Sequence, residues 1–136
     1  MGEGTNENSS LTGVWHGLYT YPDRAGLPET PFTAVVLDSG GYLSGTIHEI
    51  LQGWRGARET NAVLTGSAAD NAVSFTKAYD GTNGVKHAVH YDGHLNGERD
   101  EIEGQWNIKD DWSGRFLMIR KRGQGVAAKV EAFEQT

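Results

Sequence analysis

Apolar and polar side chains alternate along most of this chain, in short runs separated by glycine-rich turns. The first run, residues 11–21, places Trp15, Tyr19 and Tyr21 on alternate positions, with Gly17 between Trp15 and Tyr19. A β-strand turns every second side chain to the same face. The pattern therefore predicts a first strand whose aromatic face points inward.

Seven further alternating runs follow. The predicted strands cover residues 32–37, 42–50, 61–68, 72–79, 86–95, 101–108 and 112–121. Turn-forming residues occupy 38–41, 69–71, 80–84, 96–97 and 109–111, while 22–28 form a longer loop and 52–58 interrupt the alternation. Antiparallel strands joined by short turns leave exposed edges unless the sheet closes, and eight strands can close around one small ligand. The sequence thus predicts an all-β fold, an eight-stranded antiparallel up-and-down β-barrel.

Length and composition agree with a single small barrel. The chain has 136 residues, with 19 glycines and only 3 prolines. We expect a disordered leader over 1–10, the barrel over 11–122 and a tail over 123–136, in which residues 126–133 are either a short helix or an added strand. The absence of cysteine excludes a disulfide or thiolate metal site.

Charge and hydropathy restrict the partners and the location. The net charge of −6 argues against nucleic acid, which needs a clustered basic face. No apolar run approaches the ~20 residues of a membrane span, and no targeting segment is visible. A cytoplasmic protein without a membrane partner is expected.

The alternation also predicts which side chains enter the barrel. The inward set is Trp15, Tyr19, Tyr21, Leu43, Ile47, Glu49, Val73, Phe75, Lys77, Val89, Tyr91, Ile102, Trp106, Phe116, Met118 and Arg120. Three of these are charged, namely Glu49, Lys77 and Arg120. A buried charge needs a partner, so these residues are either structural or the polar groups of a ligand site. In the structural case they form an ion pair near one barrel end, for example Lys77 with Glu49 while Arg120 stacks on Trp15, or their heads reach solvent at the rim.

Several fragments resemble known barrels. Residues 11–15 (LTGVW), 43–46 (LSGT), 63–66 (VLTG), 73–77 (VSFTK) and 105–106 (QW) are similar in order and spacing to avidin/streptavidin-like barrels. The wider calycin group, including lipocalins, shares a Gly-x-Trp on the first strand and a basic residue late on the last. Gly13, Trp15 and Arg120 fit that pattern, with Arg120 able to stack on Trp15 as a structural closure.

The resemblance does not extend to biotin recognition. Avidin-like proteins carry polar hydrogen-bonding groups where this chain has Gly17, Ile47 and Glu49, and an acid where it has Arg120. Trp106 matches a pocket-wall tryptophan, and Trp112 matches the tryptophan that such barrels lend to a neighbouring subunit. The resemblance therefore implies a pocket whose ligand is not biotin.

These residues favour a small-molecule-binding barrel. The expected pocket wall is Trp15, Tyr19, Phe75, Tyr91 and Trp106, and the polar groups are Glu49, Lys77 and Arg120. Aromatic faces and two cations against one acid favour a flat or partly apolar anion. The alternative is a lyase, isomerase or cyclase with Glu49 as general base and Lys77 or Tyr91 as electrophile. No cofactor is expected, and no serine lies in a nucleophile-elbow context.

Two weaker signals concern metal and assembly. His90, Asp92 and His94 share one strand face, but that face points to solvent and neighbouring side chains lie ~7 Å apart along it, so no metal site is expected. His16 and His48 alternate outward. Trp54 and Trp112 have no place in the inward set, so they are either covered in a homodimer or lie over a barrel mouth.

Overall fold

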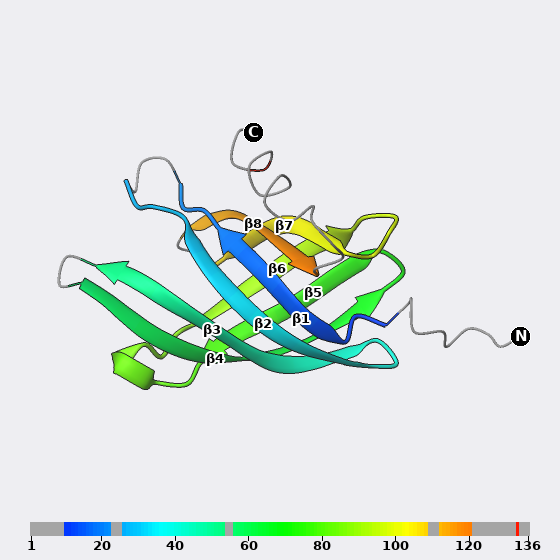
Figure 1. The fold of residues 1–136 in the computed structure, drawn as a ribbon, viewed down its shortest axis with the longest axis horizontal. Helices are drawn as coiled ribbons and strands as arrows, with labels where there is room; N and C mark the ends of the chain where they lie inside the picture. The colour runs from blue at the N-terminus through cyan, green and yellow to red at the C-terminus, as the bar shows by residue number, and fades with distance from the viewer. Residues whose placement is uncertain (1–9, 23–25, 54–55, 109–111, 121–132, 134–136) are drawn as a thin grey trace, which may run out of the picture.

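The computed structural model describes residues 10–22, 26–53, 56–108, 112–120 and 133, and these form a closed antiparallel barrel (Figure 1). Its strands are β1 (Gly13–Tyr19), β2 (Thr30–Ser39), β3 (Tyr42–Gly53), β4 (Gly56–Ala69), β5 (Ala72–Tyr79), β6 (Ala88–Leu95), β7 (Glu101–Asn107) and β8 (Ser113–Arg120), with a 3₁₀ turn, η4 (Thr82–Gly84), before β6. Each strand pairs with the next, and β1 pairs with β8. The predicted eight-stranded up-and-down barrel is confirmed, and it is compatible with a calycin-like fold.

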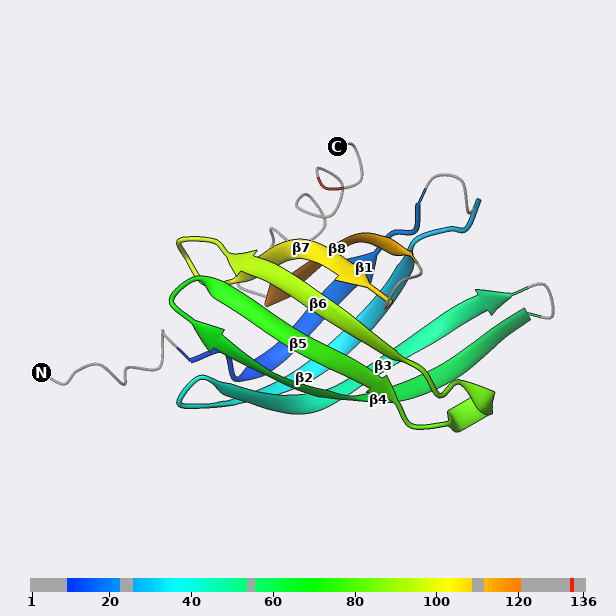
Figure 2. The same ribbon diagram turned by 180° about the vertical axis from the view of Figure 1, so that it is seen from behind.

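The β3–β4 hairpin is longer than the sequence predicts. Its ladder continues from Tyr42↔Ser67 to Gly53↔Gly56, so the predicted interruption at 52–58 is wrong. Backbone groups make the ladder, and they pair across the hairpin whether or not side chains alternate. The hairpin consequently extends beyond the neighbouring strands at one end of the barrel (Figures 1 and 2). At the other end, Gly40 and Gly41 close the β2–β3 turn with φ of 63° and 97°, a conformation that glycine adopts without strain.

The predicted inward positions fill the barrel. Fourteen of the sixteen are buried, and only Tyr21 and Arg120, near the two barrel ends, are partly exposed. Inside, Phe75 stacks on Tyr91 with ring centroids 4.7 Å apart, and Phe116 meets both rings edge-on. Edge-to-face and stacked aromatic contacts of this kind stabilise a core beyond simple area burial.

Trp15 and Arg120 close one end of the barrel. Trp15 is 0% exposed, and its indole N–H donates to the carbonyl of Leu11 at 2.9 Å. The guanidinium carbon of Arg120 lies 4.9 Å from the ring centroid of Trp15, as the sequence predicts. Arg120 also donates to the carbonyls of Ser10 and Arg99, at 2.7 and 2.5 Å. This end is filled: the void beside Trp15 measures only about 10 Å³, the lower limit for a single water molecule, and the residues that line it are apolar.

On the outer wall, β8 is buried on both faces. Leu117 and Ile119 alternate with the inward Phe116 and Met118, yet both are buried, because they form a second cluster with Leu18 and Phe133. The other residues of the predicted leader and tail lie outside the described residues, apart from Ser10. Within the described part of the chain, no helix is long and apolar enough to cross a membrane.

Candidate functional site

The end of the barrel opposite Trp15 holds a cavity of about 230 Å³. It is lined by Tyr19, Tyr21, Leu27, Leu51, Arg58, Lys77, Tyr79, His87, Val89, Tyr91, Trp106, Ile108 and Trp112. These residues come from the ends of β1, β3 and β5, from β4, β6 and β7, and from the segments that follow β1, β5 and β7. The site therefore combines rigid strand positions with residues of the connecting segments.

Aromatic rings form one wall of the cavity. Trp106 contacts Tyr19, Tyr21 and Trp112 edge-on, with centroid distances of 6.0, 5.8 and 6.0 Å, and Tyr21 lies 5.4 Å from Trp112. The indole N–H of Trp106 donates to the carbonyl of Thr20 at 2.8 Å, which holds the ring in place. Because the rings hold each other at steep angles, they form a preorganised apolar surface.

Lys77 is the polar group at the floor of the cavity, and it forms an ion pair with Glu49, which does not itself line the cavity. The two side chains are 2% and 1% exposed, and the ammonium nitrogen lies 3.2 Å from Oε2 and 3.5 Å from Oε1 of Glu49. The hydroxyls of Tyr19, at 3.1 Å, and of Tyr79 donate to Oε1. Glu49 is thus enclosed by donors, as a buried carboxylate requires.

The Lys77 ammonium lies between this carboxylate and the aromatic rings. Its nitrogen is 4.5 Å from the ring centroid of Tyr19, 4.6 Å from that of Tyr79 and 5.4 Å from that of Tyr91. These distances are within the range of cation–π attraction. Burial nevertheless lowers the pKa of Lys77 to about 8, although the charge of Glu49 opposes that change. The site therefore holds a lysine that loses its proton far more readily than a surface lysine.

Three buried tyrosines and a histidine around Lys77 are neutral at physiological pH. Burial raises the pKa of Tyr19, Tyr79 and Tyr91, and the negative charge of Glu49 raises it further. All three hydroxyls therefore keep their protons. Burial, followed by the charge of Lys77, lowers the pKa of His87, whose ring lies 4.8 Å from that of Tyr79. His87 is consequently mostly neutral above its ordinary pKa of ~6.5.

The structure brings together only part of the predicted site. Tyr19, Lys77, Tyr91 and Trp106 line the cavity, and Glu49 lies directly beneath Lys77.

The remaining three predicted residues lie elsewhere in the barrel. Trp15 and Phe75 belong to the packed region around the small void, and Arg120 joins the closed end. The prediction that Arg120 shares a pocket with Glu49 and Lys77 is thus corrected. Alternation specifies the face of a strand, whereas the register of neighbouring strands decides the height along the barrel.

Several cavity residues were not among the predicted site residues. Tyr79 lies at the second position after Lys77 on the same face of β5, so alternation alone could have identified it. Arg58 and His87 carry no such signal. Arg58 lies on the part of the β3–β4 hairpin that the sequence did not predict, and His87 lies in the segment before β6. Trp112 packs on Tyr21 and Trp106 and lines the cavity, in agreement with the alternative that it lies over a barrel mouth, and Trp54 is outside the described residues.

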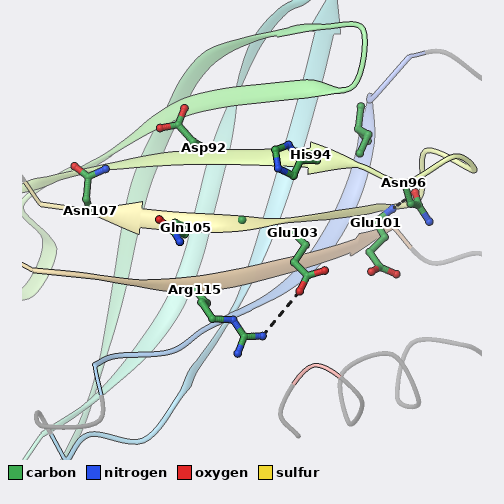
Figure 3. Close-up of a pocket in the computed structure, with 10 residues that line it drawn as sticks. Asp92, His94, Asn96, Glu101, Glu103, Gln105, Asn107 and Arg115 are labelled. Carbon is green, nitrogen blue, oxygen red and sulfur yellow. Dashed lines mark hydrogen bonds and ion pairs between the residues drawn. The ribbon is translucent and has the colours of Figure 1, made fainter. Parts of the chain in front are cut away.

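A second concavity, of about 600 Å³, lies on the outer face of β6, β7 and β8 (Figure 3). Figure 3 shows polar side chains along it, among them Asp92, His94 and Glu103, with Arg115 3.9 Å from Glu103. His90 lies 3.1 Å from Asp92, and both are substantially exposed. The described residues contain no group of three or more histidines, cysteines and acids that could hold a metal ion. As predicted, the face of β6 that carries His90, Asp92 and His94 points to solvent, because Asp92 and His94 are exposed and His90 is partly exposed.

Comparison with known proteins does not place this chain in a family. No protein-family model matches this chain, and no curated protein matches it significantly. Fold and cavity together define a closed β-barrel with buried aromatic clusters, an architecture compatible with ligand binding.

Proposed function

We propose that this protein binds a small, flat, partly apolar molecule that carries an anionic or strongly hydrogen-bond-accepting group. The observation that carries the proposal is the placement of the Lys77 ammonium at the floor of a cavity otherwise walled by aromatic rings. Specific pockets combine an apolar lining with a few polar groups that set the orientation of the ligand. Lys77 supplies such a group here.

Charge at the cavity favours an anion. Of the charged side chains among the residues that line it, Lys77 lies at the floor and Arg58 at the exposed hairpin, and no carboxylate is among the lining residues. Glu49 lies one layer deeper and is partnered by Lys77 and two tyrosines. A ligand anion approaching from the open end would therefore meet cations first, and its charge would be stabilised in a low-dielectric site.

Size narrows the ligand class. The cavity volume of about 230 Å³ lies below the range of roughly 300–1,000 Å³ typical of drug-sized ligands. A molecule with one or two fused rings fits this volume. The resemblance to avidin-like barrels supports a ligand in this position. It does not support biotin as that ligand, because Gly17, Ile47, Glu49 and Arg120 replace the groups that recognise biotin. The ring of Phe32 lies over Gly17, where a Cβ would come within 2.1 Å of it.

The catalytic alternative is less well supported. A general base must come within hydrogen-bonding distance of the proton it removes. Glu49 does not line the cavity, and its carboxylate already accepts from Lys77, Tyr19 and Tyr79. Binding needs no rearrangement of these contacts, whereas proton abstraction by Glu49 would require breaking at least one of them.

Fluorescence titration tests the proposal. Trp106 and Trp112 line the cavity, so one- and two-ring aromatic carboxylates such as cinnamate and 2-naphthoate should change their emission on binding. Trp112→Ala should weaken binding about 2- to 12-fold, because an aromatic contact contributes ~0.5–1.5 kcal/mol. Tyr42→Ala is the matched control, since Tyr42 is 77% exposed and lies at the opposite end. Unchanged emission and no heat of binding across the series would contradict the proposal.

A further inference from the structure

Lys77 differs from an ordinary lysine because its amine is enclosed in an aromatic site. The structure describes two lysines, and of these Lys77 is buried while Lys86 is exposed. The Lys77 nitrogen lies within 5.4 Å of three ring centroids, all of them from residues that line the cavity. Lysines desolvated in apolar pockets are the ones that proteins use as nucleophiles toward carbonyl compounds.

We propose that Lys77 forms an imine with a flat, conjugated aldehyde or ketone held in the cavity. This inference rests on the proposed function, and it specifies the chemistry of the group that the ligand presents to the floor. Lys77 first gives one proton to the Glu49 carboxylate, and the amine lone pair then attacks the carbonyl carbon. The electron pair of the C=O π bond moves to the oxygen, and a proton passes from nitrogen to that oxygen to give a carbinolamine. The carbinolamine oxygen then takes up a second proton and leaves as water, while the nitrogen lone pair forms the C=N bond.

The charge of the site is the same before and after the reaction. An ammonium and a carbonyl compound give an iminium and one water molecule, so one positive charge stays beside Glu49 throughout. The Glu49 carboxylate, 3.2 Å from the nitrogen, is in position to pair with either cation. The reaction thus avoids the cost of leaving a buried carboxylate without its partner. A surface lysine has no such counter-ion held in place.

Neighbouring groups supply the proton transfers. Glu49 can accept a proton from the Lys77 ammonium, and Tyr79 donates to the same carboxylate, so a proton can pass toward the carbinolamine oxygen through these groups. Glu49 and Tyr79 end the reaction as they began it.

The free amine is also more available than on the surface. With the pKa of Lys77 at about 8, the neutral amine is on the order of 200-fold more abundant at pH 7 than for a lysine of ordinary pKa ~10.4. The aromatic walls keep bulk water from the C=N bond and so slow its hydrolysis.

Reductive trapping tests the inference on the full-length protein. The protein is incubated at pH 7 with cinnamaldehyde and cyanoborohydride, and the intact mass and the digested peptides are measured. We expect one added group per chain, on Lys77. Lys77→Arg retains the positive charge but forms no simple imine, so labelling should fall at least about 10-fold, whereas Lys86→Met should leave it unchanged. Peptide mapping of the labelled parent chain locates the modified residue directly, so the test is decisive even if a Lys77 variant fails to fold.

A parallel titration with cinnamyl alcohol separates this inference from the proposed function. The alcohol has the same ring and chain but cannot form an imine. If the alcohol binds and the aldehyde does not label Lys77, the imine is refuted while binding stands. Labels spread over surface amines in proportion to their exposure would also refute it. Selective labelling of Lys77 supports the imine. If cinnamaldehyde does not label Lys77 and neither cinnamyl alcohol nor cinnamate binds, both proposals are contradicted.

Discussion

Replacing Lys77 with methionine tests the buried ion pair most directly. Methionine keeps an unbranched apolar chain that can pack among the same rings, but it removes the ammonium group. Glu49 then loses contacts of 3.2 and 3.5 Å, while the hydroxyls of Tyr19 and Tyr79 remain. Both hydroxyls donate to Oε1, whereas Oε2 has its 3.2 Å contact with Lys77, and the substitution removes that contact. The substitution therefore isolates the electrostatic contribution of the pair.

The expected loss of stability is large. Removing one partner of a buried ion pair costs ~3–5 kcal/mol. Because two hydroxyls continue to donate to the carboxylate, we place Lys77→Met at the lower end, about 3 kcal/mol, which for a chain of this length lowers Tm by on the order of 10 °C. The same variant should lose affinity for aromatic carboxylates, since Lys77 has both a structural and a ligand-facing position.

Urea unfolding of a double-mutant cycle measures this contribution. Lys77→Met, Glu49→Gln and the double variant are compared with the parent chain by far-UV circular dichroism. The double variant carries no unpaired charge, so the coupling free energy should reach about 2 kcal/mol or more. A cost below about 1 kcal/mol for Lys77→Met, the value typical of exposed pairs, would refute the reasoning, because it would mean that Glu49 is effectively solvated.

Four further predictions address pH, ligand choice, the outer wall and assembly. Between about pH 8 and 9 the free energy of unfolding should rise by up to about 1.4 kcal/mol per pH unit, because the folded chain releases the Lys77 proton near 8 and the unfolded chain near 10.4; urea titrations should show this rise in the parent but not in Lys77→Met. Above about pH 9.5 stability should fall, since the unfolded chain ionises tyrosines near pH 10 that the folded barrel keeps protonated. Calorimetry should detect no tight biotin binding, and a submicromolar constant would show that the matching of strands to avidin-like barrels is wrong. Phe133→Ala should cost about 2 kcal/mol by urea unfolding, since it removes a buried ring from Leu117 and Ile119; an unchanged midpoint would mean that this ring contributes nothing to the wall. The homodimer stays a prediction, for which sedimentation at high micromolar concentration is the measurement, and a monomer there would contradict it.

The local alternation of apolar and polar residues was enough to predict the fold. The period of two in runs such as residues 72–79 specified which side chains of β5 face inward, because a strand has only two faces and one of them must be buried. Glycine-rich turns then joined the strands in sequence, and eight such strands have no open edge when the sheet closes. The contact between Arg120 and Trp15 followed from the resemblance to calycin barrels, and the structure confirms it.

Tertiary structure decided where along the barrel each inward residue lies. Lys77 and Phe75 are two positions apart on one face, yet Lys77 lines the cavity and Phe75 the packed end, because the barrel interior changes from filled to open between them. The pairing of Lys77 with Glu49 rather than Arg120 depends on strand register across β3, β4 and β5. Such contacts join residues far apart in sequence, so the alternation left this pairing as one of several arrangements, and the register of the strands decided it.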